Sequence, residues 1–252
     1  MSFSPPMVLS FAASDPTGGA GVQADLLTLA AMGCHPLSVV TALTVQDTSG
    51  VEGVLAIDSA WVVDQARRVL DDMRVAAFKL GVLGSVDNIR AVAEVLSGHS
   101  GVPLVLDPVL ASGRGDALAS DEMIDALLEL IVPRSTVATP NSLEARRLGG
   151  VEGLIERGCR YVLVTGAHEA SEDVINTLYD AHGVVRKDCW QRLPGSYHGS
   201  GCTLASALAA GLANGLEVPE AAREAQEFTW QALAAGFRPG RGQWLPNRFF
   251  SQ

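Results

Sequence analysis

The stretch MVLSFAASDPTGGAGVQADLLTLAAM, residues 7–32, contains in order an apolar run, a glycine-rich turn and a segment of helical period. The near-continuous apolar run at residues 7–13 is typical of a strand that is buried on both faces, as in a parallel sheet. Gly18 and Gly19 permit a backbone path that brings the chain close to a ligand. Residues 20–32 then have the period of a helix. The stretch therefore predicts a strand–loop–helix unit of an α/β fold.

The same alternation continues along the chain. Further strands are predicted at residues 37–45, 76–83, 102–109, 136–139 and 161–165, and further helices at 60–73, 86–96, 120–130, 142–148, 203–213 and 219–235. Residues 175–179 and 184–190 flank the turn DAHG, which predicts a hairpin at a sheet edge. No repeat or linker divides the chain. We expect a single domain over residues 1–252, an α/β fold with a doubly wound, mainly parallel sheet flanked by helices on both faces.

Composition excludes several classes of protein. The chain has 252 residues, 48% of them hydrophobic, so it can bury a full core and is not a disordered chain. A net charge of −10 argues against a nucleic-acid partner. The four cysteines have no C-x-x-C spacing, which argues against a zinc site and a disulfide framework. The N-terminus lacks the basic region of a signal peptide, and no apolar run approaches the ~20 residues that span a bilayer. We expect a cytoplasmic protein with no membrane partner.

The segment HGSGCTL, residues 198–204, is the clearest candidate for chemistry. Gly199 and Gly201 flank Ser200 directly before an apolar helix, where converging N–H groups and the helix dipole would bind an anion such as a phosphoryl group. A cysteine in this place, Cys202, is biased toward the thiolate. The alternative is a glycine-rich turn that enters a buried helix, with Cys202 an inert core residue. Neither a P-loop nor a complete G-x-G-x-x-G is present, since Leu204 occupies the last position of that pattern.

Other polar residues follow the ends of predicted strands, where ligands bind in open α/β sheets. Asp25 lies near the start of the first helix, where it either faces a bound polar ring or is a solvated junction residue. Asp107 ends a buried strand, and Mg²⁺ or a phosphate-bound water would give its carboxylate a partner. Asn141 and Glu144 have the spacing of a capping box, which explains both residues. Their alternative role is to bind hydrated Mg²⁺ on nucleotide phosphates.

Five segments together carry a family resemblance. They are SDPTGGAGVQADLLTLAAMGCHPLSVVTALTVQDTSGV (14–51), KLGVLGS (79–85), VLDPVLASGRGD (105–116), TPNSLEA (139–145) and HGSGCTLASALAAGLANG (198–215). The sequence resembles the hydroxymethylpyrimidine and phosphomethylpyrimidine kinases of thiamine biosynthesis, within the ribokinase-like superfamily. The first and last segments are specific to these kinases, whereas TPNSLEA belongs to the wider superfamily.

The resemblance implies a ribokinase-like fold and a kinase that uses ATP and Mg²⁺ to phosphorylate 4-amino-5-hydroxymethyl-2-methylpyrimidine, and in many members also its monophosphate. It implies that Asp25 and Gln46 hydrogen-bond the aminopyrimidine, and that Ala13 and Val82 line the ring pocket. The catalytic anion hole would comprise Gly199, Ser200 and Gly201, with Cys202 as the proton acceptor. The remaining implied contacts are Asn141, Thr165 and Thr203 for the nucleotide and its phosphates, and Asp107 and Glu144 for the metal. We also expect a homodimer.

The chain departs from the family pattern in two places. Thr165 begins TGAH where the family usually has Lys-Gly-Gly-His, so a positive charge near the phosphates is missing or is supplied elsewhere. Ala13 stands where glycine is common, and its methyl group narrows the ring pocket. Two other readings stay open: a pyridoxal or pyridoxine kinase, and a non-catalytic protein that binds the pyrimidine.

Overall fold

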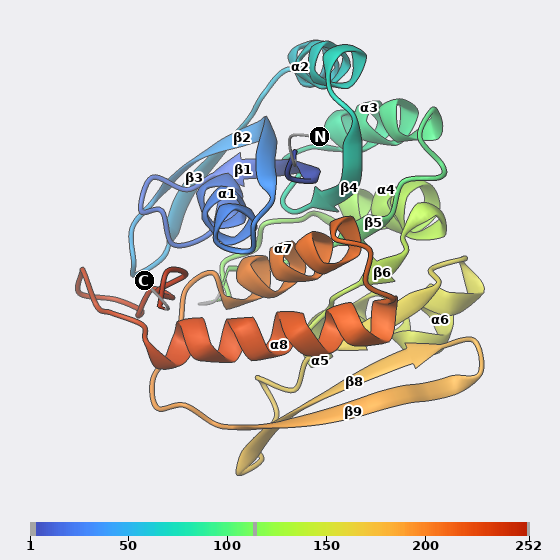
Figure 1. Cartoon of the computed structure of the whole chain (residues 1–252). Helices are drawn as coiled ribbons and strands as arrows, with labels where there is room; N and C mark the ends of the chain where they lie inside the picture. The colour runs from blue at the N-terminus through green and yellow to red at the C-terminus, as the bar shows by residue number, and fades with distance from the viewer. Residues whose placement is uncertain (1–3, 113–114, 251–252) are drawn as a thin grey trace.

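The computed structural model describes residues 4–112 and 115–250 (Figure 1). Its centre is a nine-stranded sheet in the order β3-β2-β1-β4-β5-β6-β7-β8-β9. Strands β2, β1, β4, β5, β6 and β7 are parallel, whereas β3 at one edge and β8 and β9 at the other are antiparallel. The strands are β1 Met7–Ser14, β2 His35–Gln46, β3 Val51–Ala56, β4 Val75–Leu80, β5 Leu104–Leu106, β6 Val137–Ala138, β7 Tyr161–Val164, β8 Asp173–Asp180 and β9 Gly183–Gln191.

Helices cover both faces of the sheet, as the sequence predicts. They are α1 Gly21–Ala31, α2 Ser59–Asp72, α3 Val86–Ser97, α4 Asp121–Ala126, α5 Ser142–Arg147, α6 Gly150–Glu156, α7 Ser200–Ala213 and α8 Val218–Ala234. One core cluster joins α2, α3, α4 and α6 to residues such as Leu9 and Phe11 of β1. The other cluster joins α1, α7 and α8 to Val8 of the same strand, and Figure 1 shows α7 and α8 side by side. Successive side chains of a strand point to opposite faces of the sheet, so Val8 and Leu9 pack into different clusters and β1 is apolar on both faces.

Most predicted elements are present, with some shifts. Strand β3 and helix α6 lie where no element was predicted, and α7 begins at Ser200 rather than at residue 203. The predicted strand at 102–109 is reduced to Leu104–Leu106, directly after Pro103, which has no N–H to donate to a sheet. The predicted hairpin is confirmed as β8 and β9. Within the described ranges, none of the helices combines the length and the apolar composition that crossing a membrane requires.

Candidate active site

A cavity of about 510 Å³ opens at the carboxyl edge of the parallel strands. Its wall includes residues at or after the ends of β1, β2, β4, β5, β6 and β7, together with the start of α7. Neighbouring strands lie ~4.8 Å apart, so the five steps from β2 to β7 span about 24 Å, which is room for two ligands end to end. Most of the predicted site residues line this one cavity: Ala13, Gln46, Val82, Asp107, Asn141, Glu144, Thr165, Gly199, Ser200, Gly201 and Cys202.

The residues predicted to bind the ring lie at the end of the cavity near β1 and β2. Ala13 is almost completely buried in its wall, while Gln46 and Val82 are half-buried and line it. Gln46 forms the last residue of β2, which holds its amide at the cavity. An amide both donates and accepts hydrogen bonds, so it can read a ring with an amino group and nitrogen acceptors.

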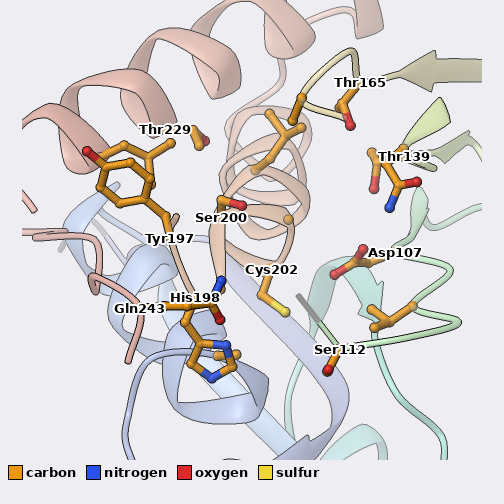
Figure 2. Close-up of a pocket in the computed structure, with 18 of the residues that line it drawn as sticks. Asp107, Ser112, Thr139, Thr165, Tyr197, His198, Ser200, Cys202, Thr229 and Gln243 are labelled. Atoms are coloured by element: carbon orange, nitrogen blue, oxygen red, sulfur yellow. The ribbon is translucent and has the colours of Figure 1, made fainter. Parts of the chain in front are cut away.

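The start of α7 forms the middle of the site. Gly199 has a φ of 78°, and a side chain on it would collide with the carbonyl oxygen of Gly19, so only glycine fits here. The first N–H groups of a helix have no intrahelical acceptor, which leaves those of Ser200, Gly201 and Cys202 at the cavity. Figure 2 shows Ser200 and Cys202 projecting from this first turn, with Asp107 across from Cys202. An arrangement of this kind stabilises a transferring anion.

The thiol of Cys202 differs from the sequence-based expectation. Burial raises the pKa of Cys202 to about 12; the charge of Lys79 opposes this effect, and the carboxylates of Asp107 and Asp25 add to it. The expected bias toward a thiolate is therefore wrong for the free enzyme, because desolvation outweighs the field of the helix terminus. Cys202 is therefore a neutral thiol at pH 7.

Lys79, in β4, is a site residue that sequence reasoning missed. Its side chain is fully buried, with Nζ 2.9 Å from Oδ1 of Asp25 and 3.7 Å from Oδ2 of Asp107. Burial is the largest single effect and lowers the pKa of Lys79, but the negative charge and hydrogen bond of Asp25 and the nearby charges at Cys202 and Asp107 together outweigh it and raise the pKa above its ordinary value. The one available signal was a lysine within an otherwise apolar buried strand, VAAFKL. This ammonium group places a fixed positive charge beside Cys202 and Asp107.

Asp25 does not occupy the predicted position at the ring. Its side chain is completely buried and does not line the cavity. Besides Lys79, its carboxylate accepts hydrogen bonds from the hydroxyls of Ser10 and Ser206, the latter at 2.8 Å. The prediction that Asp25 binds the pyrimidine directly is therefore corrected: Asp25 holds Lys79 in place.

Asp107 and Glu144 are the predicted metal ligands, and they differ in the hydrogen-bond partners of their carboxylate oxygens. Among the described residues, none forms a hydrogen bond with the buried Oδ2 of Asp107, although Nζ of Lys79 lies 3.7 Å away, and burial raises the pKa of this carboxyl group. Glu144 instead accepts from the N–H groups of Asn141 at 2.9 Å and Leu110 at 3.2 Å, and burial raises its pKa to about 7. A free carboxylate oxygen fits Mg²⁺, which keeps several waters and binds mainly substrate phosphates. Asp107 fits this role and Glu144 does not.

Two of the three predicted nucleotide and phosphate contacts line the cavity, and the third does not. Asn141 forms the capping box with Glu144 at the start of α5, so its side chain serves the helix while still lining the cavity. Thr165 lies beside Asn141 at the end of β7 and lines the same wall. Thr203 is fully buried and outside the cavity wall, so the prediction that it contacts the nucleotide is corrected. Its hydroxyl donates to the carbonyl of Gly199 at 2.8 Å and steadies the first turn of α7.

Comparison with known proteins agrees with this geometry. The sequence profile of the phosphomethylpyrimidine kinase family matches residues 15–247. The chain is 41% identical to the hydroxymethylpyrimidine/phosphomethylpyrimidine kinase of Streptomyces coelicolor, over 94% of this chain and 92% of that protein. It is 36% identical to the enzyme of the same name from Rhizobium meliloti, over 94% of both chains.

Solved structures show the same fold. The phosphomethylpyrimidine kinase of Clostridium difficile is 31% identical, with a TM-score of 0.79 over 90% of this chain and 99% of that one. Bacillus subtilis pyridoxal kinase, solved as an ADP complex, is 30% identical, with a TM-score of 0.88 over 97% and 98% of the two chains. These structural neighbours are ribokinase-like, which confirms the predicted fold class. On the match of both profile and relatives, the chain belongs to the phosphomethylpyrimidine kinase family.

Proposed function

We propose that the protein transfers the γ-phosphoryl group of ATP to the hydroxymethyl group of 4-amino-5-hydroxymethyl-2-methylpyrimidine, and then phosphorylates the monophosphate to the diphosphate. The observation that carries the proposal is one cavity that is lined by Gln46, by the first turn of α7 and by Thr165, which we take as its ring end, its transfer site and its phosphate end. In-line transfer needs this order of groups. Family membership and the names of the relatives support the same reaction.

The chain's own residues act mainly by alignment and charge. Gln46 reads the polar edge of the ring, and Ala13 and Val82 enclose its faces. The substrate hydroxyl lies beside Cys202, and the N–H groups of Ser200 to Cys202 stabilise the charge that develops on the γ-phosphoryl oxygens. Because Cys202 is a neutral thiol, the hydroxyl keeps its proton until the new O–P bond forms; the proton then passes to a phosphoryl oxygen or to water, and ADP is the leaving group.

Positive charge at the phosphates comes from two sources. Asp107 would hold Mg²⁺, which would neutralise charge on the nucleotide phosphates. Lys79 supplies a permanent charge from beneath Cys202 and Asp107. Lys79 therefore provides a positive charge in this chain, in which Thr165 stands where the family usually has a lysine.

Phosphorus NMR of products after long incubation of the pyrimidine with MgATP tests the reaction. We expect resonances of the monophosphate and then of the diphosphate, each dependent on the enzyme. A spectrum that contains only ATP and its hydrolysis products would refute the proposed function and favour a protein that binds the pyrimidine without turnover.

Pyridoxal kinase is the second candidate, because the Bacillus subtilis pyridoxal kinase has a TM-score of 0.88 with this chain. The curated relatives at 36–41% identity bear the pyrimidine kinase name, which favours the pyrimidine. We expect a kcat/KM at least about tenfold higher for the hydroxymethylpyrimidine than for pyridoxal, which corresponds to about 1.4 kcal/mol of discrimination. The reverse ratio would assign the enzyme to pyridoxal.

Assembly and location are further parts of the proposal. We infer a homodimer from the apolar side chains exposed on β2 and β3, among them Val45 and Leu55, which are 64% and 66% exposed. Light scattering after size exclusion tests it, and a monomer mass would contradict it. The continuous sheet supports a single domain over 1–252. Free cysteines at positions 34, 159, 189 and 202 support a reducing, cytoplasmic location.

A further inference from the structure

Arg248 lies in the segment that follows α8, and this segment folds back onto the body of the protein. The N–H of Asn247 donates to the carbonyl of Ala232 at 2.9 Å, and the ring of Phe250 packs against that of Phe228 with centroids 5.3 Å apart. Arg248 points inward from this segment and is only 4% exposed. The segment therefore places a buried guanidinium group close to α7.

The contacts of Arg248 join two loops of the site. Its Nη2 donates to the carbonyl oxygen of Gly19 at 2.6 Å, in the loop between β1 and α1. Its Nε donates to Oγ1 of Thr203 at 3.1 Å, in the first turn of α7. Thr203 in turn donates to the carbonyl of Gly199, the residue that packs directly against Gly19. One guanidinium group thus spans the glycine-rich loop and the helix start that face the reacting groups.

A second link joins the same two loops on the cavity side. Nε2 of His198 lies 2.8 Å from Oδ2 of Asp15, and this carboxylate also accepts from the N–H of Ala20 at 2.7 Å. The His198 ring lines the cavity, whereas Arg248 lies behind its wall. The two links hold the loops from opposite sides, which restricts both their separation and their tilt.

The burial of Arg248 needs a reason other than an ion pair. Its described polar contacts go to a backbone carbonyl and a hydroxyl rather than to a carboxylate, and burial lowers the pKa of the guanidinium group. Burying a charge without a direct counter-charge is unfavourable for stability. A planar fork that reaches two acceptors on different loops is the geometry that arginine provides and lysine does not.

We propose that Arg248 is a positioning residue for phosphoryl transfer, which fixes the Gly18–Gly19 loop against the first turn of α7 so that the substrate hydroxyl and the helix N–H groups face each other. The proposal rests on the proposed kinase function. It concerns the alignment of bound substrates rather than their affinity. Its effect therefore falls on kcat.

Arg248→Met and Arg248→Lys test the proposal, with Phe250→Ala as a matched control. The control removes the ring contact between Phe250 and Phe228 in the same C-terminal segment, and it removes neither Arg248 nor the two atoms to which Arg248 donates. We expect Arg248→Met to lower kcat by about 10- to 100-fold while both KM values stay within about threefold, because misplacement of reacting groups by about 1 Å costs this much. Arg248→Lys retains the charge and one bond, so its kcat should lie between that of the parent and that of Arg248→Met. Phe250→Ala should keep kcat within about twofold of the parent, even if it lowers the Tm as much as Arg248→Met does.

Hydrogen exchange tests the positioning without substrate. Peptides that cover residues 15–24 and 198–206 should exchange faster in Arg248→Met than in the parent, and not faster in Phe250→Ala. A failure of the proposed function, seen as no product with the parent enzyme, leaves this measurement decisive. Equal exchange in Arg248→Met and the parent would overturn the proposal. An equal fall of kcat in Arg248→Met and Phe250→Ala would overturn it as well, since it would assign Arg248 to general stability.

Discussion

Replacement of Lys79 by methionine removes the ammonium group beneath the site while keeping a side chain of similar length. In the parent, Nζ of Lys79 lies 2.9 Å from Asp25 and both side chains are fully buried. At an effective dielectric constant of about 20, two unit charges at this distance attract each other by about 6 kcal/mol. Desolvation opposes part of this attraction, but the single substitution also leaves the carboxylate of Asp25 buried without its cation. We expect the free energy of unfolding to fall by about 3–5 kcal/mol.

The double variant Lys79→Met with Asp25→Asn separates stability from catalysis. It removes both charges, so the free energy of unfolding should return to within about 2 kcal/mol of the parent. Its kcat should stay about 10²-fold below the parent, because the cation 3.7 Å from Asp107 is still absent. Urea unfolding followed by circular dichroism and steady-state kinetics measure the two quantities. The exposed pair Arg67 and Glu94, at 3.5 Å, is the control, and the matching double variant should change stability by less than about 1 kcal/mol.

Two results would refute the reasoning on Lys79. Recovery of the parent kcat in the stable double variant would mean that Lys79 and Asp25 form a structural pair with no effect on transfer. An unchanged free energy of unfolding in Lys79→Met alone would mean that the burial and distances of the pair do not determine its energy.

Further substitutions address the other parts of the site. Gln46→Ala should raise the KM for the pyrimidine by about 5- to 100-fold and leave the KM for ATP unchanged, because unpaired polar groups cost about 1–3 kcal/mol; equal rises would refute its role at the ring. Cys202→Ala should keep kcat within about tenfold, since a thiol with a pKa of about 12 is neutral at pH 7; a loss of about 10²–10⁴ would show that bound substrate converts it to a base. Asp107→Asn should raise the Mg²⁺ concentration for half-maximal rate, and an unchanged value would assign Asp107 to structure. Folding raises the pKa of Glu144 from 4.5 to about 7, so the folded chain binds this proton more tightly than the unfolded chain does. The free energy of unfolding should therefore fall by up to about 3 kcal/mol as the pH rises from 4.5 to about 7. Urea unfolding of Glu144→Gln should lack this fall, and an identical pH dependence in parent and variant would contradict the assignment.

The parallel centre of the fold could be predicted because its strands are apolar on both faces. Strand β3 could not, since its sequence VEGVLA contains a charge and a glycine, half of its residues are exposed and none is buried. Helix α6 begins at Gly150, directly after Gly149; both glycines have positive φ, and such a pair suggests a break in the chain rather than the start of a helix. Local sequence thus predicts elements where burial determines composition, and fails where an edge strand or an unusual helix start is specified by its neighbours.

The residues of the site were also predictable only in part. The rule that ligands bind at the carboxyl ends of strands predicted a common site for Asp107, Asn141 and the Gly199–Cys202 turn, and all of these residues line one cavity. It could not show that Asp25 turns inward, because the orientation of α1 depends on its packing against the sheet. Lys79 contacts a partner 54 positions away and Arg248 one 229 positions away, so no local pattern reveals either contact. The pKa of Cys202 depends on burial by those same distant segments.

Helix α7 lies against β1, β4 and β5, in the middle of the sheet, yet it comes late in the chain. At a translation rate of roughly 5–20 residues per second, the ribosome needs on the order of 10–40 seconds to reach Ser200. Until then apolar residues of the nascent sheet such as Ala77 and Val105 lack the cover of α7, and of the three helices in this core cluster only α1 has been synthesised. The nascent chain is therefore exposed to aggregation and to chaperone binding for most of its synthesis. The segment to which we assign the anion hole is thus also the one whose synthesis covers this face of the central strands.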